Sequence, residues 1–84
     1  MEVSVRTDNG SLGNVRVSDE NLEIVRFEFN PSMMKSVNYA KILSAALMTV
    51  VDKMGNDARA NAIAKTHVET ACMYAVKSMT AESK

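Results

Sequence analysis

Residues 54–57, MGND, separate two long segments with helical periodicity and decide how the chain is organised. Gly55 is suited to end a helix, because glycine adopts the backbone conformations that follow a last helical turn without steric cost. Either of the next two residues, Asn and Asp, can accept a hydrogen bond from the first turn of a second helix. A link this short keeps two helices adjacent. The sequence therefore predicts neighbouring antiparallel helices over residues 30–55 and 56–81.

The segment before these helices alternates in the manner of β-strands. EVSVRT (residues 2–7) and NVRV (residues 14–17) place valines at every second position, and the Asn-Gly and Gly-Asn pairs between them are typical of turns. The two runs predict a β-hairpin with a loop longer than two residues. EIVRFEF (residues 23–29) also alternates and predicts a third strand. The expected fold is therefore α+β: one domain, residues 1–84, with a small antiparallel sheet in residues 1–29 and then the two helices.

The predicted first helix is apolar over most of its circumference. Asn30 and Pro31 mark its start, because Asn is a favoured N-cap and Pro is tolerated at the first helical position. One stripe holds Met33, Val37, Ala40, Leu47, Val51 and Met54, and beside it lie Met34, Tyr39, Ile42, Leu43, Met48 and Val50. One small sheet and one other helix cannot cover so much apolar surface. The pattern predicts an obligate oligomer.

Composition argues against several classes of function. The 84 residues include 10 Lys plus Arg and 10 Asp plus Glu, and the zero formal charge argues against binding to DNA or RNA polymers. A single cysteine excludes an intrachain disulfide and favours a reducing cytoplasm. The N-terminal MEVSVRTDNG lacks the pattern of a signal peptide. No apolar run approaches the roughly 20 residues that a membrane span needs.

The second predicted helix contains NAIAKTHVETACMYAVKSM, residues 61–79, in which polar side chains are threaded between small ones. At about 100° per residue, one strip of this helix collects four polar side chains: Arg59, Thr66, Thr70 and Lys77. Positive charges near both ends and hydroxyls between them suit a phosphate-bearing ligand. A strip of this kind is also what an ordinary solvated helix face looks like. Periodicity leaves both interpretations open.

A second candidate group lies at the start of the first predicted helix. Asn38 and Lys41 are three residues apart and share a helix face, and Phe29 immediately precedes the predicted helix start. A ring, an amide and an ammonium near one helix N-terminus could bind a base and a phosphate together. Alternatively, Phe29 fills the core and Lys41 extends along apolar surface until its ammonium reaches water.

The chain has no recognisable catalytic constellation. His67 and Cys72 are five residues apart, so on one helix their side chains point roughly 140° apart and cannot act as a pair. One histidine and one cysteine are also too few for a metal site. The sequence contains no glycine-rich phosphate loop before a helix and no nucleophile elbow. We therefore expect a protein that is not an enzyme and has no metal or cofactor.

Two segments together resemble a known family. They are RFEFNPS followed by VNYAKILSAAL, within residues 26–47, and IAKTHVETACMYAVKSMTA, residues 63–81. Their order and separation are similar to those of the small phage-encoded sponge proteins that defeat the CBASS and Thoeris bacterial defence systems. The strand leading into FNPS and the hairpin before it resemble the anti-Thoeris branch more closely.

The resemblance implies a hexamer that binds cyclic nucleotide signals in the host cytoplasm and hides them from their effectors without cleaving them. It also implies two kinds of site. Cyclic ADP-ribose isomers or cyclic dinucleotides would bind between subunits through Phe29, Asn38 and Lys41. Cyclic trinucleotides would bind where helices of three subunits meet, through Arg59, Lys65 and Thr66.

Two other functions compete with this interpretation. A non-catalytic oligomeric adaptor of a phage, which uses Met-rich faces to bind another protein, would also explain the 7 methionines. A nucleotide hydrolase would bind the same ligands, but the sequence has no residues that could carry the reaction.

Overall fold

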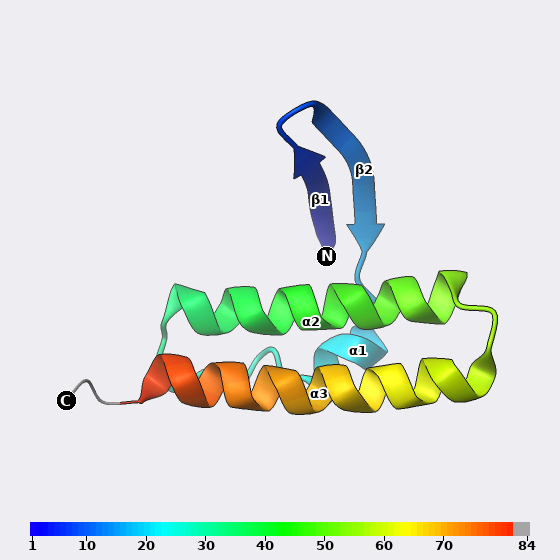
Figure 1. The fold of residues 1–84 in the computed structure, drawn as a ribbon. Coiled ribbons are helices and arrows are strands. Elements are labelled where there is room, and N and C mark those ends of the chain that lie inside the picture. Colours follow the sequence, from blue (N-terminus) through cyan, green and yellow to red (C-terminus); the bar gives the residue numbers. More distant parts are fainter. Residues whose placement is uncertain (82–84) are drawn as a thin grey trace.

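The computed structural model describes residues 1–81 and shows a β-hairpin followed by three helices. The hairpin consists of β1 (Glu2–Thr7) and β2 (Gly10–Arg16). Its base contacts α2, and its tip projects away from the helices (Figure 1). The helices are α1 (Asp19–Ile24), α2 (Lys35–Met54) and α3 (Ala58–Thr80). The antiparallel α2 and α3 lie side by side, and α1 packs against α2 (Figure 1). The predicted α+β class, with an antiparallel β-hairpin before the helices, is confirmed, and the sheet has two strands.

The link between α2 and α3 explains why a glycine stands at position 55. A Cβ on Gly55 would collide with the side chain of Asn61 and would lie 2.7 Å from the carbonyl oxygen of Val51. Asn61 Nδ2 in turn donates to the carbonyl oxygen of Gly55 at 3.2 Å. Of the two candidate caps for α3, Asp57 occupies the position, and its Oδ1 accepts a hydrogen bond from Ala60 N at 3.0 Å.

The prediction of a long hairpin loop was wrong. β1 and β2 are joined by only two residues, Asp8 and Asn9, and β2 begins at Gly10. Gly10 and Gly13 have positive φ angles of 126° and 121°, so the strand continues through a sequence that resembles a loop. The pairing register shifts between Val5 and Arg6, since Val5 pairs with Gly13 and Arg6 with Ser11. This shift is a β-bulge or a similar irregularity of the ladder.

The prediction of a third strand over residues 23–29 was also wrong, because this segment contains the end of α1 and a series of turns. Ser18 caps α1, and its hydroxyl oxygen accepts a hydrogen bond from Asn21 N at 3.2 Å. Asp19 and Glu20 in the first turn favour the helix further through its dipole. After the helix, Arg26 adopts a φ of 53°, which breaks the extended backbone that a strand requires.

The predicted helix start at Asn30 and Pro31 was wrong as well, because α2 begins at Lys35. The Asn30 side chain organises a turn instead of capping the helix. Its Nδ2 donates to Met34 O at 3.1 Å and to Asn38 Oδ1 at 3.0 Å. Ser32 Oγ donates to Asn30 Oδ1 at 2.6 Å. The polar residues of the NPS segment are therefore used within the loop that leads into α2.

The core lies where the end of β2, the end of α1 and the middle of the two long helices meet. Its buried apolar residues are Val17, Val25, Ala45, Ala46, Met48 and Cys72. Val3 and Val15, which face each other across the hairpin, pack against this cluster. These contacts attach the hairpin to the helices and stabilise it, because a two-stranded hairpin is only marginally stable alone.

A buried polar network joins α1 to α2. Asn21 is fully buried, and its Nδ2 donates to Thr49 Oγ1 at 3.1 Å and to Asp52 Oδ2 at 3.0 Å. Thr49 Oγ1 also accepts from Ser18 N at 3.2 Å and donates to Ala45 O at 2.8 Å. Asn21 Oδ1 is buried without a hydrogen-bond partner among the residues that the structure describes. The stabilising contribution of the amide therefore comes from its Nδ2 group.

Replacing Asn21 by alanine should destabilise the protein by about 1–3 kcal/mol, because Thr49 and Asp52 lose a buried donor and a cavity opens between α1 and α2. Urea unfolding at a fixed protein concentration measures the change. Asn14→Ala, at an exposed position of β2, is the control and should stay within about 0.5 kcal/mol of the parent. Equal losses of stability in the two variants would contradict the conclusion that the Asn21 side chain joins α1 to α2.

Candidate ligand-binding site

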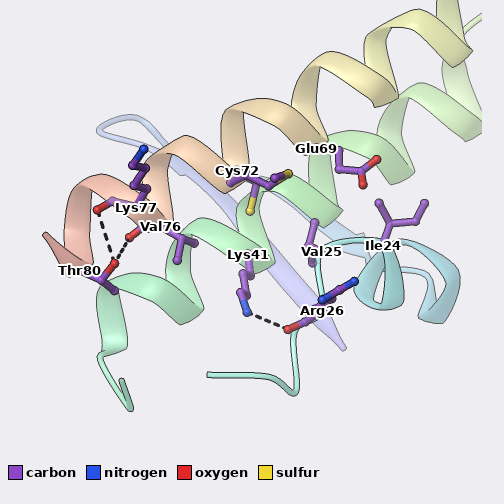
Figure 2. A pocket seen from close by; sticks show the side chains of 10 residues that line it. Ile24, Val25, Arg26, Lys41, Glu69, Cys72, Val76, Lys77 and Thr80 are labelled. Atoms are coloured by element: carbon purple, nitrogen blue, oxygen red, sulfur yellow. Dashed lines mark hydrogen bonds between the residues drawn. The ribbon is translucent and has the colours of Figure 1, made fainter. Parts of the chain in front are cut away.

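A groove of about 700 Å³ runs between α3 and the segment that follows α1, with Lys41 of α2 in its wall (Figure 2). This volume falls within the range typical of small-molecule sites, about 300–1,000 Å³. Val25, Cys72 and Val76 give the groove an apolar lining, and Arg26 and Glu69 add charged groups from opposite walls. An apolar hollow with a few charged side chains can hold a flat ligand and orient its polar groups.

Lys41 holds the segment that forms one wall of this groove. Its side chain is buried, and its ammonium donates to Arg26 O at 2.8 Å and to Phe29 O. The same ammonium lies 5.9 Å from the centroid of the Phe29 ring. These bonds fix a loop that contains two residues with positive φ, Arg26 and Met33. An ammonium has three donors, so one N–H of Lys41 remains after the two carbonyl bonds.

The structure places Phe29, Asn38 and Lys41 around this loop. Phe29 is 64% exposed, so it does not fill the core. Asn38 is half-buried, and its Oδ1 accepts the hydrogen bond from Asn30. Phe29 lines a second hollow of about 630 Å³, and Arg26 lies in the walls of both hollows. The predicted first group therefore adjoins the groove, but only Lys41 belongs to its lining.

The structure separates the residues of the second predicted group. Arg59 and Thr66 are exposed on α3, and Thr66 Oγ1 donates to the carbonyl oxygen of Ala62 at 3.1 Å. Lys65 turns instead toward α2, and its ammonium forms an ion pair with Asp52 Oδ2 at 3.1 Å. The hydroxyl and the ammonium thus already have partners within the chain.

Asp52 connects this group to the buried network. The hydrogen bond from Asn21 lowers the pKa of Asp52 below its ordinary value, and the hydrogen bond and charge of Lys65 lower it further. Partial burial opposes both effects, since it disfavours the charged carboxylate. Asp52 is therefore an ionised partner for Lys65 at neutral pH.

The two residues considered for nucleophilic chemistry lie in different environments. Cys72 is buried in the core, and its Sγ lies 3.9 Å from the carbonyl oxygen of Ala40, while His67 is exposed. Within residues 1–81, no three metal-ligating side chains gather at one place. No helix of the same segment is both long enough and apolar enough to cross a membrane.

Comparison with known families identifies the helical part of the chain. The family model described as Acb2/Tad1, hairpin domain, matches residues 20–80. This chain belongs to the Acb2/Tad1 family. Members of this family are phage proteins that counter the CBASS and Thoeris defences as cyclic nucleotide sponges, and they are known as binders and not as enzymes. The resemblance to this family that was inferred from the sequence is thereby confirmed.

The match defines which part of the chain is the Acb2/Tad1 domain. It begins within α1 and ends at the last residue of α3, so β1 and β2 lie outside it. The groove, the loop held by Lys41 and the Asp52–Lys65 ion pair all lie inside it. No curated protein and no solved structure matches the chain.

Sequence reasoning missed Arg26 and Glu69 as charged residues of the groove. Arg26 was assigned to a strand, so its position beside α3 could not be foreseen. Sequence reasoning also missed the polar network around Asp52. One signal was present, because Thr49 lies on an otherwise apolar face of α2. Thr49 is 1% exposed, and a buried hydroxyl of this kind needs polar neighbours.

Lys41→Met keeps the length of the side chain and removes its ammonium. We expect a loss of about 1.5–3 kcal/mol in stability, because two backbone carbonyls lose a charged donor. Hydrogen exchange should also become faster in the loop over residues 26–34. Lys35→Met, at an exposed position in the first turn of α2, is the matched control and should change neither quantity. A Lys41→Met variant as stable as this control would show that the ammonium does not hold the loop.

Proposed function

We propose that this protein sequesters cyclic nucleotide signals of the bacterial host and so blocks Thoeris or CBASS effectors in the host cytoplasm, without cleaving the ligand. The observation that carries the proposal is the family match over residues 20–80, which includes both long helices. Sequestration needs tight binding and no chemistry, which agrees with a groove of apolar and charged side chains.

For cyclic ADP-ribose isomers or cyclic dinucleotides, we propose a site at Phe29, Asn38 and Lys41. The exposed ring of Phe29 provides a stacking surface for a base. Lys41 lines the groove, and its third N–H would donate to a phosphate oxygen there while its two bonds to the loop are kept. Asn38 lies beside them through its bond to Asn30 and can exchange that bond for a ligand contact.

For cyclic trinucleotides, we propose a site at Arg59, Lys65 and Thr66, repeated around a symmetry axis. One copy offers the exposed guanidinium of Arg59 and the hydroxyl of Thr66, whose proton is donated to its own helix. Such a set binds phosphate weakly, whereas three copies around an axis would provide several charge-assisted hydrogen bonds. This site therefore depends on assembly.

The proposed assembly is a hexamer of this chain. Its support is an apolar strip on α2 that the single chain leaves uncovered, formed by Tyr39, Leu43, Leu47 and Met54 with exposed fractions of 60%, 58%, 51% and 73%. These positions recur at helical spacing along one side of α2. A continuous apolar strip on a long helix is typical of a surface that a second copy covers.

The exposed methionines also favour a second candidate function, a phage adaptor that binds another protein. Met33, Met54 and Met73 are 87%, 73% and 66% exposed, and flexible thioether side chains suit adaptable contact surfaces. Ligand binding separates the two proposals, because an adaptor has no reason to bind cyclic nucleotides.

Thermal-shift measurements test the proposal with a panel of cyclic ADP-ribose isomers, cyclic dinucleotides and cyclic trinucleotides. Ligands that bind should raise the melting temperature of the protein, because binding stabilises the native assembly. The ligand should be recovered unchanged after denaturation of the complex. Phe29→Ala should weaken dinucleotide or cyclic ADP-ribose binding about tenfold or more and spare trinucleotides. Thr66→Val should have the opposite selectivity. A panel without any binding would favour the adaptor, and a cleaved ligand would contradict sequestration.

Light scattering should show an oligomer at micromolar concentration, with a mass near six times 9.2 kDa if the hexamer is correct. Leu43→Lys introduces a charge into the apolar strip of α2 and should lower the mass. Leu12→Lys is the control, because Leu12 is 72% exposed but lies on the hairpin. A folded, monodisperse monomer of the parent chain would remove the assembly and the trinucleotide site that depends on it.

A further inference from the structure

Within the proposed trinucleotide site, Lys65 differs from its neighbours. Arg59 and Thr66 are exposed on α3, whereas the Lys65 side chain is only 19% exposed. Its ammonium lies 3.1 Å from Asp52 Oδ2 on α2. A cation with a carboxylate partner is a weaker phosphate ligand than a free one, because the phosphate must displace or share that partner.

Asp52 is held by more than this ion pair. Its Oδ2 also accepts from Asn21 Nδ2 at 3.0 Å, and Asn21 is fully buried with a second bond to Thr49. Surface ion pairs are usually weak because two flexible side chains must be ordered to form them. Here the buried amide has already ordered the carboxylate, so only Lys65 loses freedom when the pair forms. The lowered pKa of Asp52 agrees with a carboxylate that stays charged.

We propose that Asp52 limits the affinity of the proposed trinucleotide site for phosphate-bearing ligands by holding Lys65 as its ion-pair partner. The inference rests on the proposed trinucleotide site and adds a residue that regulates it. An incoming polyanion either binds without Lys65 or separates it from an anchored carboxylate. In both cases it also meets the negative charge of Asp52.

Asp52→Asn tests the proposal with little change in shape. The amide oxygen can still accept the hydrogen bond from Asn21, so the joint between α1 and α2 is kept, while the charge that holds Lys65 is removed. An exposed ion pair typically changes an equilibrium constant about 1.4- to fivefold, and removal of the nearby negative charge adds to this. We expect Asp52→Asn to bind cyclic triadenylate about threefold more tightly or better, with a gain that shrinks at high salt.

Two comparisons isolate the role of the ion pair. Glu28→Gln makes the same change of charge at an exposed position of the loop and should leave the affinity unchanged. In a Lys65→Met background, Asp52→Asn should produce a clearly smaller gain, since the cation that it releases is absent and only the removal of the negative charge remains. Circular dichroism checks the fold of each variant. If Asp52→Asn does not fold, Asp52→Ser, which also removes the charge and keeps a polar side chain, takes its place.

Isothermal titration with cyclic triadenylate separates a failure of this proposal from a failure of the proposed function. Tighter binding by Asp52→Asn that depends on Lys65 supports the role of Asp52. Equal affinities for the parent and Asp52→Asn overturn it, including the case in which neither binds. A gain of the same size in the Lys65→Met background also overturns it, because the cause is then a general change of charge. If Asp52→Asn binds and the parent does not, the role of Asp52 is supported and trinucleotide sequestration by the parent fails.

Discussion

The position of α1 on α2 depends on one buried amide. Asn21 is the only described residue of α1 that is buried, and its Nδ2 group bonds to Thr49 and Asp52, which lie three residues apart on one face of α2. A helix of six residues cannot hold its place by apolar contacts alone. The two hydrogen bonds fix both its position and its orientation on α2. They also determine where the chain leaves α1, and therefore where the loop over residues 26–34 meets α2 and α3.

Two lysines, Lys41 and Lys65, bind partners within the chain in different ways. Lys41 points into the chain and binds backbone carbonyls, so it stabilises a loop whose unusual backbone angles would otherwise be costly. Lys65 lies on α3, turns toward α2 and forms an ion pair with the carboxylate of Asp52. Both are cations that a sequence analysis assigns to phosphate binding, and both have intramolecular partners. How readily each lysine binds a ligand therefore depends on how strongly its intramolecular partner holds it, and not only on the number of positive charges in the chain.

The features of the fold that sequence could predict are those that depend on neighbours along the chain. The α2–α3 hairpin followed from Gly55 and the cap at Asp57, and the β-hairpin followed from alternating valines. The segment over residues 23–29 alternates as a strand does, yet its conformation is set by Ser18 upstream and by Lys41 far along the chain. A local pattern cannot report such partners. The same reason explains why the family segment was recognised while the groove residues Arg26 and Glu69 were missed.

The hairpin has a different relation to the rest of the molecule. Only its base contacts the core, through Val3 and Val15, and a hydrogen bond from Val17 N to Met1 O closes that base at 2.8 Å. Its tip, with the Asp8–Asn9 turn, stands free of the helices (Figure 1). Lengthening a solvent-exposed tip costs little entropy and disturbs no packing. The tip is therefore a position where a fluorescent or affinity peptide can be inserted without altering the helices that carry the proposed sites.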